Sequence, residues 1–119
     1  MVEKFGTEDV VRQYRSKKYP FACDFYIKSL DLYIECHFSH FHNFRPFDKN
    51  NSEHIKELKI FENKAKEINF KGVAKRQYNM VINIWTKTDP KKLQTFIGNK
   101  LNYKIFYTFE DFEQWYREI

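Results

Sequence analysis

The fold of this chain is decided by the stretch YPFACDFYIKSLDLYIECH, residues 19–37. Apolar and polar side chains alternate on both sides of a polar segment, which is the pattern of two β-strands joined by a turn. Successive side chains in a strand point to opposite faces, so the stretch has two distinct faces. One face carries Phe25, Ile27, Leu32 and Ile34, and the other carries Asp24, Tyr26, Tyr33, Glu35 and His37. We expect the first face to be core and the second to be a site.

The register of this hairpin follows from the same pattern. Pairing Ile27 with Leu32 across a four-residue loop, residues 28–31, also brings Asp24 opposite Glu35. A slip by one residue would move every apolar side chain to the wrong face. Two carboxylates directly opposite each other destabilise a strand pair unless a cation lies between them. The sequence therefore predicts a cation at this place, and a divalent metal ion is one candidate.

Length and composition indicate one globular domain, residues 1–119. The chain has 119 residues, of which 19% are aromatic, so it can build a core without a metal or a disulfide. Its net charge of +5 permits a polyanionic partner without demanding one.

The sequence contains no apolar run near 18 residues and no basic leader, so we expect a cytosolic protein without a membrane partner. In that compartment Cys23 and Cys36 should be thiols. The register places them opposite each other on the core face, where we expect small buried hydrophobic groups rather than a disulfide.

The remaining elements follow from periodicity and capping signals. Residues 7–16 are expected to form a helix with Thr7 as its N-cap and a basic last turn. The other expected elements are a helix over 53–68, a two-face-buried strand over 79–85, a helix from Thr88 or Asp89 to Gly98, a strand over 101–107 and a helix over 109–118. The expected order is helix-strand-strand-helix-strand-helix-strand-helix, an α/β fold with a mixed sheet flanked by helices on both sides.

The hairpin residues resemble a known signature. Asp24, ten intervening residues and then Glu35-Cys36-His37 resemble the active-site motif of the PD-(D/E)xK nuclease superfamily. The stretches around both strands, together with residues 45–48, 84–90 and 101–103, resemble phage- and prophage-encoded endonuclease domains. These domains are similar to very-short-patch repair endonucleases and their homing relatives. The resemblance runs from about Phe5 to Tyr107.

This resemblance implies a restriction-endonuclease-like sheet and a metal-dependent DNA endonuclease encoded by a phage or another mobile element. Asp24, Glu35 and the carbonyl of Cys36 would then hold Mg²⁺ or Mn²⁺, because these ions prefer oxygen ligands. The ion would activate a water molecule and stabilise the charge that develops on the phosphate during phosphodiester hydrolysis.

One position departs from the family pattern. The residue two positions after the glutamate is usually Lys or Gln, whereas this chain has His37. A neutral imidazole could act as general base, or the change could mark a domain that binds DNA without cutting it. The resemblance also implies a catalytic histidine in the following loop. His40 and His42 are both candidates, and the sequence does not choose between them.

DNA contacts are expected from basic residues outside the motif. The candidates are Arg12, Arg15, Lys17, Arg45, Lys87, Lys91 and Lys92, each with solvated surface charge as its alternative. The enzyme could act as a homodimer in order to cut both strands. Two other functions stay open: a catalytically altered module that binds nucleic acid or a host protein, and a small zinc protein that uses His37, His40, His42 and a nearby cysteine.

Overall fold

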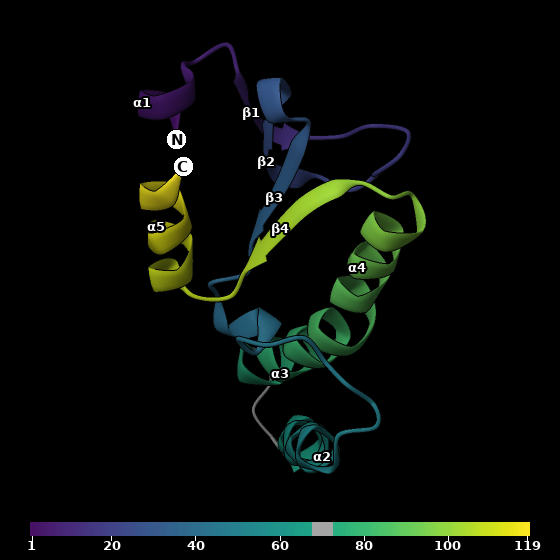
Figure 1. Cartoon of the computed structure of the whole chain (residues 1–119). Helices are drawn as coiled ribbons and strands as arrows, with labels where there is room; N and C mark the ends of the chain where they lie inside the picture. Colours follow the sequence, from purple (N-terminus) through teal and green to yellow (C-terminus); the bar gives the residue numbers. More distant parts are fainter. Residues whose placement is uncertain (68–72) are drawn as a thin grey trace. The chain divides into compact units, whose positions relative to one another are not determined.

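The computed structural model describes residues 1–67 and 73–119 (Figure 1). Its helices and strands are α1 (Val2–Phe5), β1 (Val10–Tyr14), β2 (Cys23–Ile27), β3 (Leu32–Cys36), α2 (Ser52–Glu67), α3 (Val73–Asn83), α4 (Asp89–Gly98), β4 (Asn102–Phe106) and α5 (Phe109–Glu118). Short 3₁₀ turns lie at Lys28–Leu30 and His40–His42, and a π-helical turn spans Ile84–Thr88. None of the helices in the described ranges combines the length and the apolar character needed to cross a bilayer.

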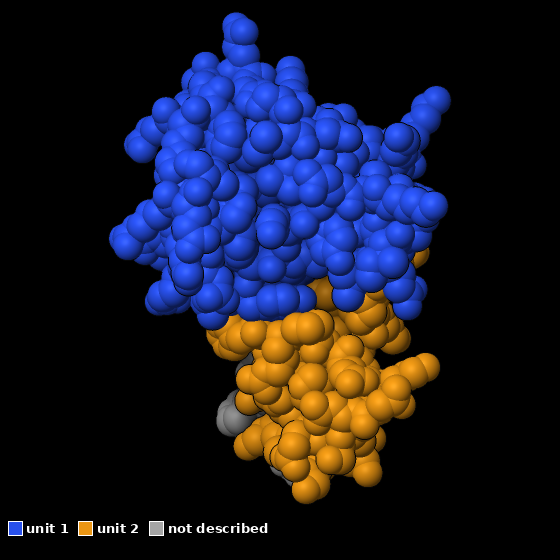
Figure 2. Space-filling model, in the orientation of Figure 1, with its two compact units in different colours: residues 1–38, 92–119 blue, residues 39–91 orange. Residues whose placement is uncertain are grey.

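The chain divides into two compact units, which Figure 2 shows in blue and orange. Unit 1 consists of residues 1–38 and 92–119, and it contains the sheet, α1, α5 and most of α4. Unit 2 consists of residues 39–91 and contains α2, α3 and the π turn. Unit 1 is therefore built from two separate stretches of chain.

The sheet of unit 1 is mixed, as predicted. Its strand order is β1-β2-β3-β4, with the first three strands antiparallel and β4 parallel to β3. The predicted hairpin register is confirmed, because Ile27 pairs with Leu32, and the ladder continues to Phe25 and Ile34. The loop between the two strands ends at Asp31 in the left-handed conformation, with φ 46°.

Both faces of the sheet are covered. On one face Ile27, Leu32, Ile34 and Phe106 form a cluster against Phe112 and Trp115 of α5. On the other face Tyr19, Cys23, Tyr33 and Phe96 of α4 form an aromatic cluster. The expectation of helices on both sides is confirmed, and α5 and α4 lie on opposite sides of the sheet in Figure 1. The expected polar face is corrected: most of it is aromatic core, and only its Glu35 end is polar.

The helix predicted over residues 7–16 is wrong. Val10–Tyr14 is an edge strand, β1, that pairs antiparallel with β2. Two adjacent valines and a tyrosine suit a strand as well as a short helix, and Tyr14 stacks on Tyr26 across the pair at 4.1 Å. Arg12, Arg15 and Lys17 therefore do not form the last turn of a helix.

The strand predicted over residues 79–85 is also wrong, because this run lies in α3 and the π turn. Val81 and Trp85 are its buried residues, and their spacing of four places them on one helix face. The predicted cap at Thr88 or Asp89 is wrong as well, since Asp89 has helical dihedral angles. Pro90 has no N–H to donate to the preceding turn, and the wider π turn ends at Thr88, two residues before it. One strand-helix-strand crossing is present instead of two.

The other predicted elements are confirmed. The side-chain oxygen of Asn51 caps α2 by accepting the N–H groups of Glu53 and His54, at 2.9 and 3.2 Å. The predicted end of this helix at Ile68 lies outside the described residues. β4 lies within its predicted range, α4 ends at Gly98, and α5 has its predicted span over residues 109–118.

Candidate functional site

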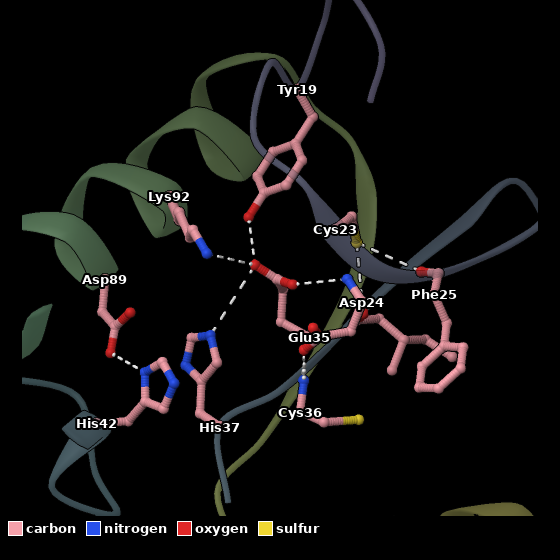
Figure 3. A network of polar contacts seen from close by, with 11 residues as sticks. Tyr19, Cys23, Asp24, Phe25, Glu35, Cys36, His37, His42, Asp89 and Lys92 are labelled. Atoms are coloured by element: carbon pink, nitrogen blue, oxygen red, sulfur yellow. Dashed lines mark hydrogen bonds and ion pairs between the residues drawn. The ribbon is translucent and has the colours of Figure 1, made fainter. Parts of the chain in front are cut away.

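Glu35 is the centre of a buried polar network in unit 1 (Figure 3). It lies near the end of β3 and only 1% of its surface is exposed. Its Oε2 accepts a hydrogen bond from the Tyr19 hydroxyl at 2.8 Å and lies 3.1 Å from Nζ of Lys92. Its Oε1 accepts the backbone N–H of Asp24 at 2.9 Å. The two oxygens thus share a counter-charge and two neutral donors.

These neighbours keep Glu35 ionised. Burial opposes its charged form, but His37, the Lys92 ammonium and the N–H and O–H donors together lower the pKa of Glu35 to about 2. His37 Nε2 lies 3.9 Å from Oε2, which is too long for a direct hydrogen bond. We therefore attribute the lower pKa chiefly to Lys92 and the two direct donors. Glu35 is an anion throughout the physiological pH range.

Asp24 completes a reciprocal arrangement at the end of the hairpin. The ladder between β2 and β3 runs to Phe25 and Ile34. Beyond it, Oδ2 of Asp24 accepts the backbone N–H of Cys36 at 2.7 Å, while Glu35 accepts that of Asp24. Each acid thus binds the main chain of the opposite strand. Burial raises the pKa of Asp24.

Tyr19 joins this network to the aromatic core. Its ring is fully buried and stacks on Phe96 of α4, with 4.1 Å between the ring centroids. Burial and the neighbouring Glu35 raise the pKa of the Tyr19 hydroxyl well above its usual range, so the hydroxyl remains a hydrogen-bond donor. A turn fixes its approach, since the backbone N–H of Tyr19 donates to the Ser16 hydroxyl at 3.0 Å.

His37 follows Glu35 into the interior and is 2% exposed. Its backbone N–H donates to the Phe106 carbonyl at 2.7 Å, and its ring meets Tyr107 edge-on at 5.6 Å. His37 thus places a buried imidazole beside the Glu35 carboxylate.

The two cysteines are free thiols, as predicted. They do not lie together on one core face, however, which corrects the expected arrangement. Cys23 packs in the aromatic cluster with Tyr33, whereas Cys36 packs against the apolar cluster around Ile34. Burial raises the pKa of both thiols to about 12. Cys36 is the last residue of β3 and packs in the cluster around Ile34, whereas the ring of His37, the next residue, lies beside Glu35. The Cys36 thiol is therefore poorly placed to share a zinc ion with His37.

The two loop histidines belong to unit 2 and have different surroundings. His40 is exposed, and its ring lies 4.2 Å from that of Phe41. His42 is partly buried, and its Nδ1 lies 2.7 Å from Oδ2 of Asp89. Asp89 is itself 6% exposed. A carboxylate that holds one ring nitrogen fixes the tautomer and orientation of the imidazole, so His42 has the form of an acid–base group.

The basic residues of unit 1 that are predicted to contact DNA have different surroundings. Arg12 is exposed on β1, above the Phe25 ring at 5.8 Å. Arg15 donates to the Pro20 carbonyl at 3.3 Å, and Lys17 is exposed in the same turn. Lys92 is the exception, because it faces Glu35 rather than solvent.

The basic residues of unit 2 that are predicted to contact DNA are Arg45, Lys87 and Lys91. Arg45 forms an ion pair with Glu57 at 2.9 Å. Lys87 lies in the π turn and Lys91 lies in α4, and both are exposed.

No protein family, curated protein or solved structure matches this chain. The chemistry of the site is therefore inferred from its own residues.

Sequence reasoning missed two members of the Glu35 network. The pattern of residues 19–37 assigns no role to Tyr19, and it is DNA phosphate, not a carboxylate, that Lys92 is expected to contact. One signal could have shown that Lys92 points inward, because it precedes Phe96 by four residues and so shares the buried face of the helix. Nothing in the sequence alone shows which carboxylate it meets.

The carboxylates of this network suit a hard cation. Asp24 and Glu35 provide oxygen ligands of the kind that Mg²⁺ prefers. Among the described residues, Oδ1 of Asp24 accepts no hydrogen bond, whereas both oxygens of Glu35 are engaged. The group therefore offers one open carboxylate oxygen next to a buried anion whose present counter-charge is Lys92.

Proposed function

We propose that this protein is a metal-dependent DNA endonuclease whose phosphodiester-cleaving groups lie at the Asp24–Glu35 end of the hairpin. The observation that carries the proposal is the Glu35 network. A fully buried carboxylate is kept ionised by Lys92, Tyr19 and a backbone N–H, beside a second acid with an open oxygen. Strongly perturbed carboxylates with a specific charged partner are typical of functional sites.

Asp24 and Glu35 would hold Mg²⁺ or Mn²⁺. When bound, such an ion makes water nucleophilic near neutral pH and stabilises charge on the phosphate. Burial raises the pKa of Asp24, and a cation bound by Asp24 and Glu35 would favour the charged form of this carboxylate.

Lys92 supplies an ammonium group to the same place. In the resembling family the lysine stands two residues after the glutamate, where this chain has His37. Here the ammonium comes from α4 instead and lies 3.1 Å from Oε2 of Glu35. A fixed positive charge in a buried site can stabilise the negative charge that develops as a phosphodiester is attacked. Lys92 is therefore assigned to charge stabilisation rather than to general DNA contact.

Proton transfer is assigned to His42 rather than His40. The Asp89 carboxylate lies 2.7 Å from Nδ1 of His42, and a carboxylate so placed orients an imidazole for proton transfer. The ring of His40 rests only against Phe41 among the contacts described for it. His37 is kept as a neighbour that tunes the charge of Glu35.

The decisive experiment is cleavage of supercoiled plasmid DNA with Mg²⁺ or Mn²⁺. We expect nicking that falls on the order of a hundredfold in Glu35→Gln and in Asp24→Asn. Glu113→Gln is the matched control, because Glu113 lies on α5 and forms an ion pair with Arg117 of the same helix. Wild-type protein that never nicks DNA, or acid variants as active as the control, would refute the proposal.

A nuclease-like module that binds without cutting is the second candidate. It is favoured by the engagement of both Glu35 oxygens, because Lys92 already provides the counter-charge that a metal would provide. Calorimetric titration with Mn²⁺ separates the two functions. Heat of binding that disappears in Asp24→Asn supports the nuclease, and its absence in the wild-type protein supports the module.

A further inference from the structure

The net positive charge of this protein lies in unit 2. Residues 39–91 contain 11 Lys and Arg against 6 Asp and Glu, which leaves +5. Residues 1–38 and 92–119 contain 10 of each kind, which leaves zero. The whole net charge of +5 therefore belongs to the orange unit of Figure 2.

A general preference for lysine does not explain this division. Such a preference would act on both units alike, yet the larger unit is neutral. Within the unit Glu57 pairs with Arg45 and Asp89 lies against His42, and neither contact changes the excess of Lys and Arg over Asp and Glu. The excess positive charge therefore belongs to a unit of 53 residues, 39–91.

The basic side chains of unit 2 that the structure describes are exposed. They are Arg45, Lys49, Lys56, Lys59, Lys64, Lys66, Lys75, Arg76, Lys87 and Lys91. Two of them flank a groove between α2 and α3, where Lys66 comes from one helix and Lys75 from the other. Asn79 adds an amide to the same groove, and Glu62 adds one carboxylate, so the two lysines leave the groove with a net positive charge. Lysine, arginine and amide donors are the groups that contact phosphate oxygens.

The aromatic residues of unit 2 distinguish between duplex and single-stranded partners. Proteins that hold single strands present aromatic rings on which bases stack. Trp85 is fully buried, Phe61 and Tyr78 are partly buried, and Phe44 is the one aromatic ring in the exposed class among the described residues of this unit. A surface with many exposed cations and few exposed aromatic rings is suited to binding the phosphates of a DNA duplex.

We propose that unit 2 is the part of this protein that holds the phosphate backbone of double-stranded DNA. The inference deepens the proposed function, on whose DNA substrate it rests, but it does not depend on cleavage. It moves the main contact surface away from Arg12, Arg15 and Lys17 of unit 1 and onto α2 and α3. Binding through it depends on salt and not on base sequence.

The test compares two variants of equal net charge. Lys66→Gln with Lys75→Gln removes two cations from the groove of unit 2. Lys28→Gln with Lys104→Gln removes two exposed cations from unit 1 and is the matched control. Binding to a fluorescent duplex of about 20 base pairs is followed by anisotropy in EDTA, between about 50 and 200 mM KCl. EDTA prevents cleavage, so binding is read separately from activity.

We expect the unit 2 variant to bind the duplex more weakly than the wild type. The magnitude of its slope of log K against log salt should be smaller by about 2, and the control should match the wild type. Equal losses in both variants, preference for a single strand of the same length, or no duplex binding by the wild type would each overturn the inference. Binding that localises to unit 2 in a protein that never cuts would leave the inference standing and refute the proposed nuclease. Thermal unfolding of each variant checks that it is folded.

Discussion

Replacement of Lys92 by methionine tests the ion pair on which the site depends. Methionine keeps most of the apolar stem of lysine and removes the ammonium, so the change isolates the charge. Lys92 is 18% exposed and Glu35 is 1% exposed, so water cannot replace the lost partner easily. The Tyr19 hydroxyl and the backbone N–H of Asp24 remain as donors to the carboxylate. The variant therefore holds a buried anion without a counter-charge.

The size of the effect follows from the pKa of Glu35. A fall from the usual value of 4.5 to about 2 corresponds to about 3 kcal/mol of folded-state stability. Because the pKa is lower in the folded protein, the unfolded chain takes up the proton first as the pH falls. This stability is complete above pH 4.5 and disappears as the pH falls to about 2. Breaking a buried ion pair by removing one partner costs about 3–5 kcal/mol, and the partial exposure of Lys92 favours the lower end.

Guanidinium denaturation from about pH 7 to pH 3 provides the measurement. We expect Lys92→Met to lose about 3 kcal/mol near neutral pH and to lose less on acidification than the wild type. In a Glu35→Gln background the same change should cost below about 1 kcal/mol. Lys104→Met, at an exposed position of β4, is the control and should stay within about 0.5 kcal/mol of the wild type. A Lys92 variant as stable as this control would refute the reasoning.

Three further outcomes are expected. Tyr19→Phe keeps the stacked ring but removes the hydrogen bond to Glu35, so denaturation should show a loss of about 1.5–3 kcal/mol, and a loss below about 0.5 would contradict a role for the hydroxyl. Asp24→Asn removes a carboxylate whose pKa is raised by burial, so the variant should be more stable than the wild type near neutral pH and should lose Mn²⁺ binding in calorimetry. That gain should vanish below the usual pKa of 3.8, and undiminished Mn²⁺ affinity would argue against the site. His42→Ala should slow plasmid cleavage at least about a hundredfold while His40→Ala cuts normally, and equal rates would reverse the assignment.

Local patterns were sufficient for the hairpin and for α5. The hairpin alternates strictly, so one register satisfies every pair from Ile27 to Phe25. The last helix has Phe109, Phe112 and Trp115 at helical spacing, and Thr108 caps it through Asp111. In both places the periodicity of the side chains and the turn or capping residues favour the same structure, and tertiary packing selects that structure as well.

The two wrong elements are short apolar runs whose period is ambiguous. The five residues of β1 are too few to separate a strand from a helix, and the strand was selected by pairing with β2. The run ending at Trp85 has apolar residues on adjacent positions, which suits a buried strand or a buried helix equally. Its helical state depends on packing against α2, and that contact is invisible to a local window.

The two acids of the candidate site could be predicted from the sequence, but the residues that contact them could not. Asp24 and Glu35 stand on the hairpin itself, so their proximity follows from the register. Lys92 reaches Glu35 only because β4 returns parallel to β3 and brings α4 over the aromatic face. The sequence predicts a cation between the two acids. The Lys92 ammonium is a cation beside this pair, but its ion pair is with Glu35 and not with Asp24.

The parallel pairing of β3 with β4 has a consequence for how the chain folds. Leu32 pairs with Asn102 and Cys36 with Phe106, so all of α2 and α3 must be bridged before this ladder forms. Closing a loop of that length costs about 4 kcal/mol of chain entropy, whereas β1, β2 and β3 meet through short turns. We expect the β1–β2–β3 meander and the α2–α3 pair to form early and β4 to dock last. Until then β3 has an open edge, and during synthesis the length of residues 39–91 sets how long that edge is available for pairing with another chain.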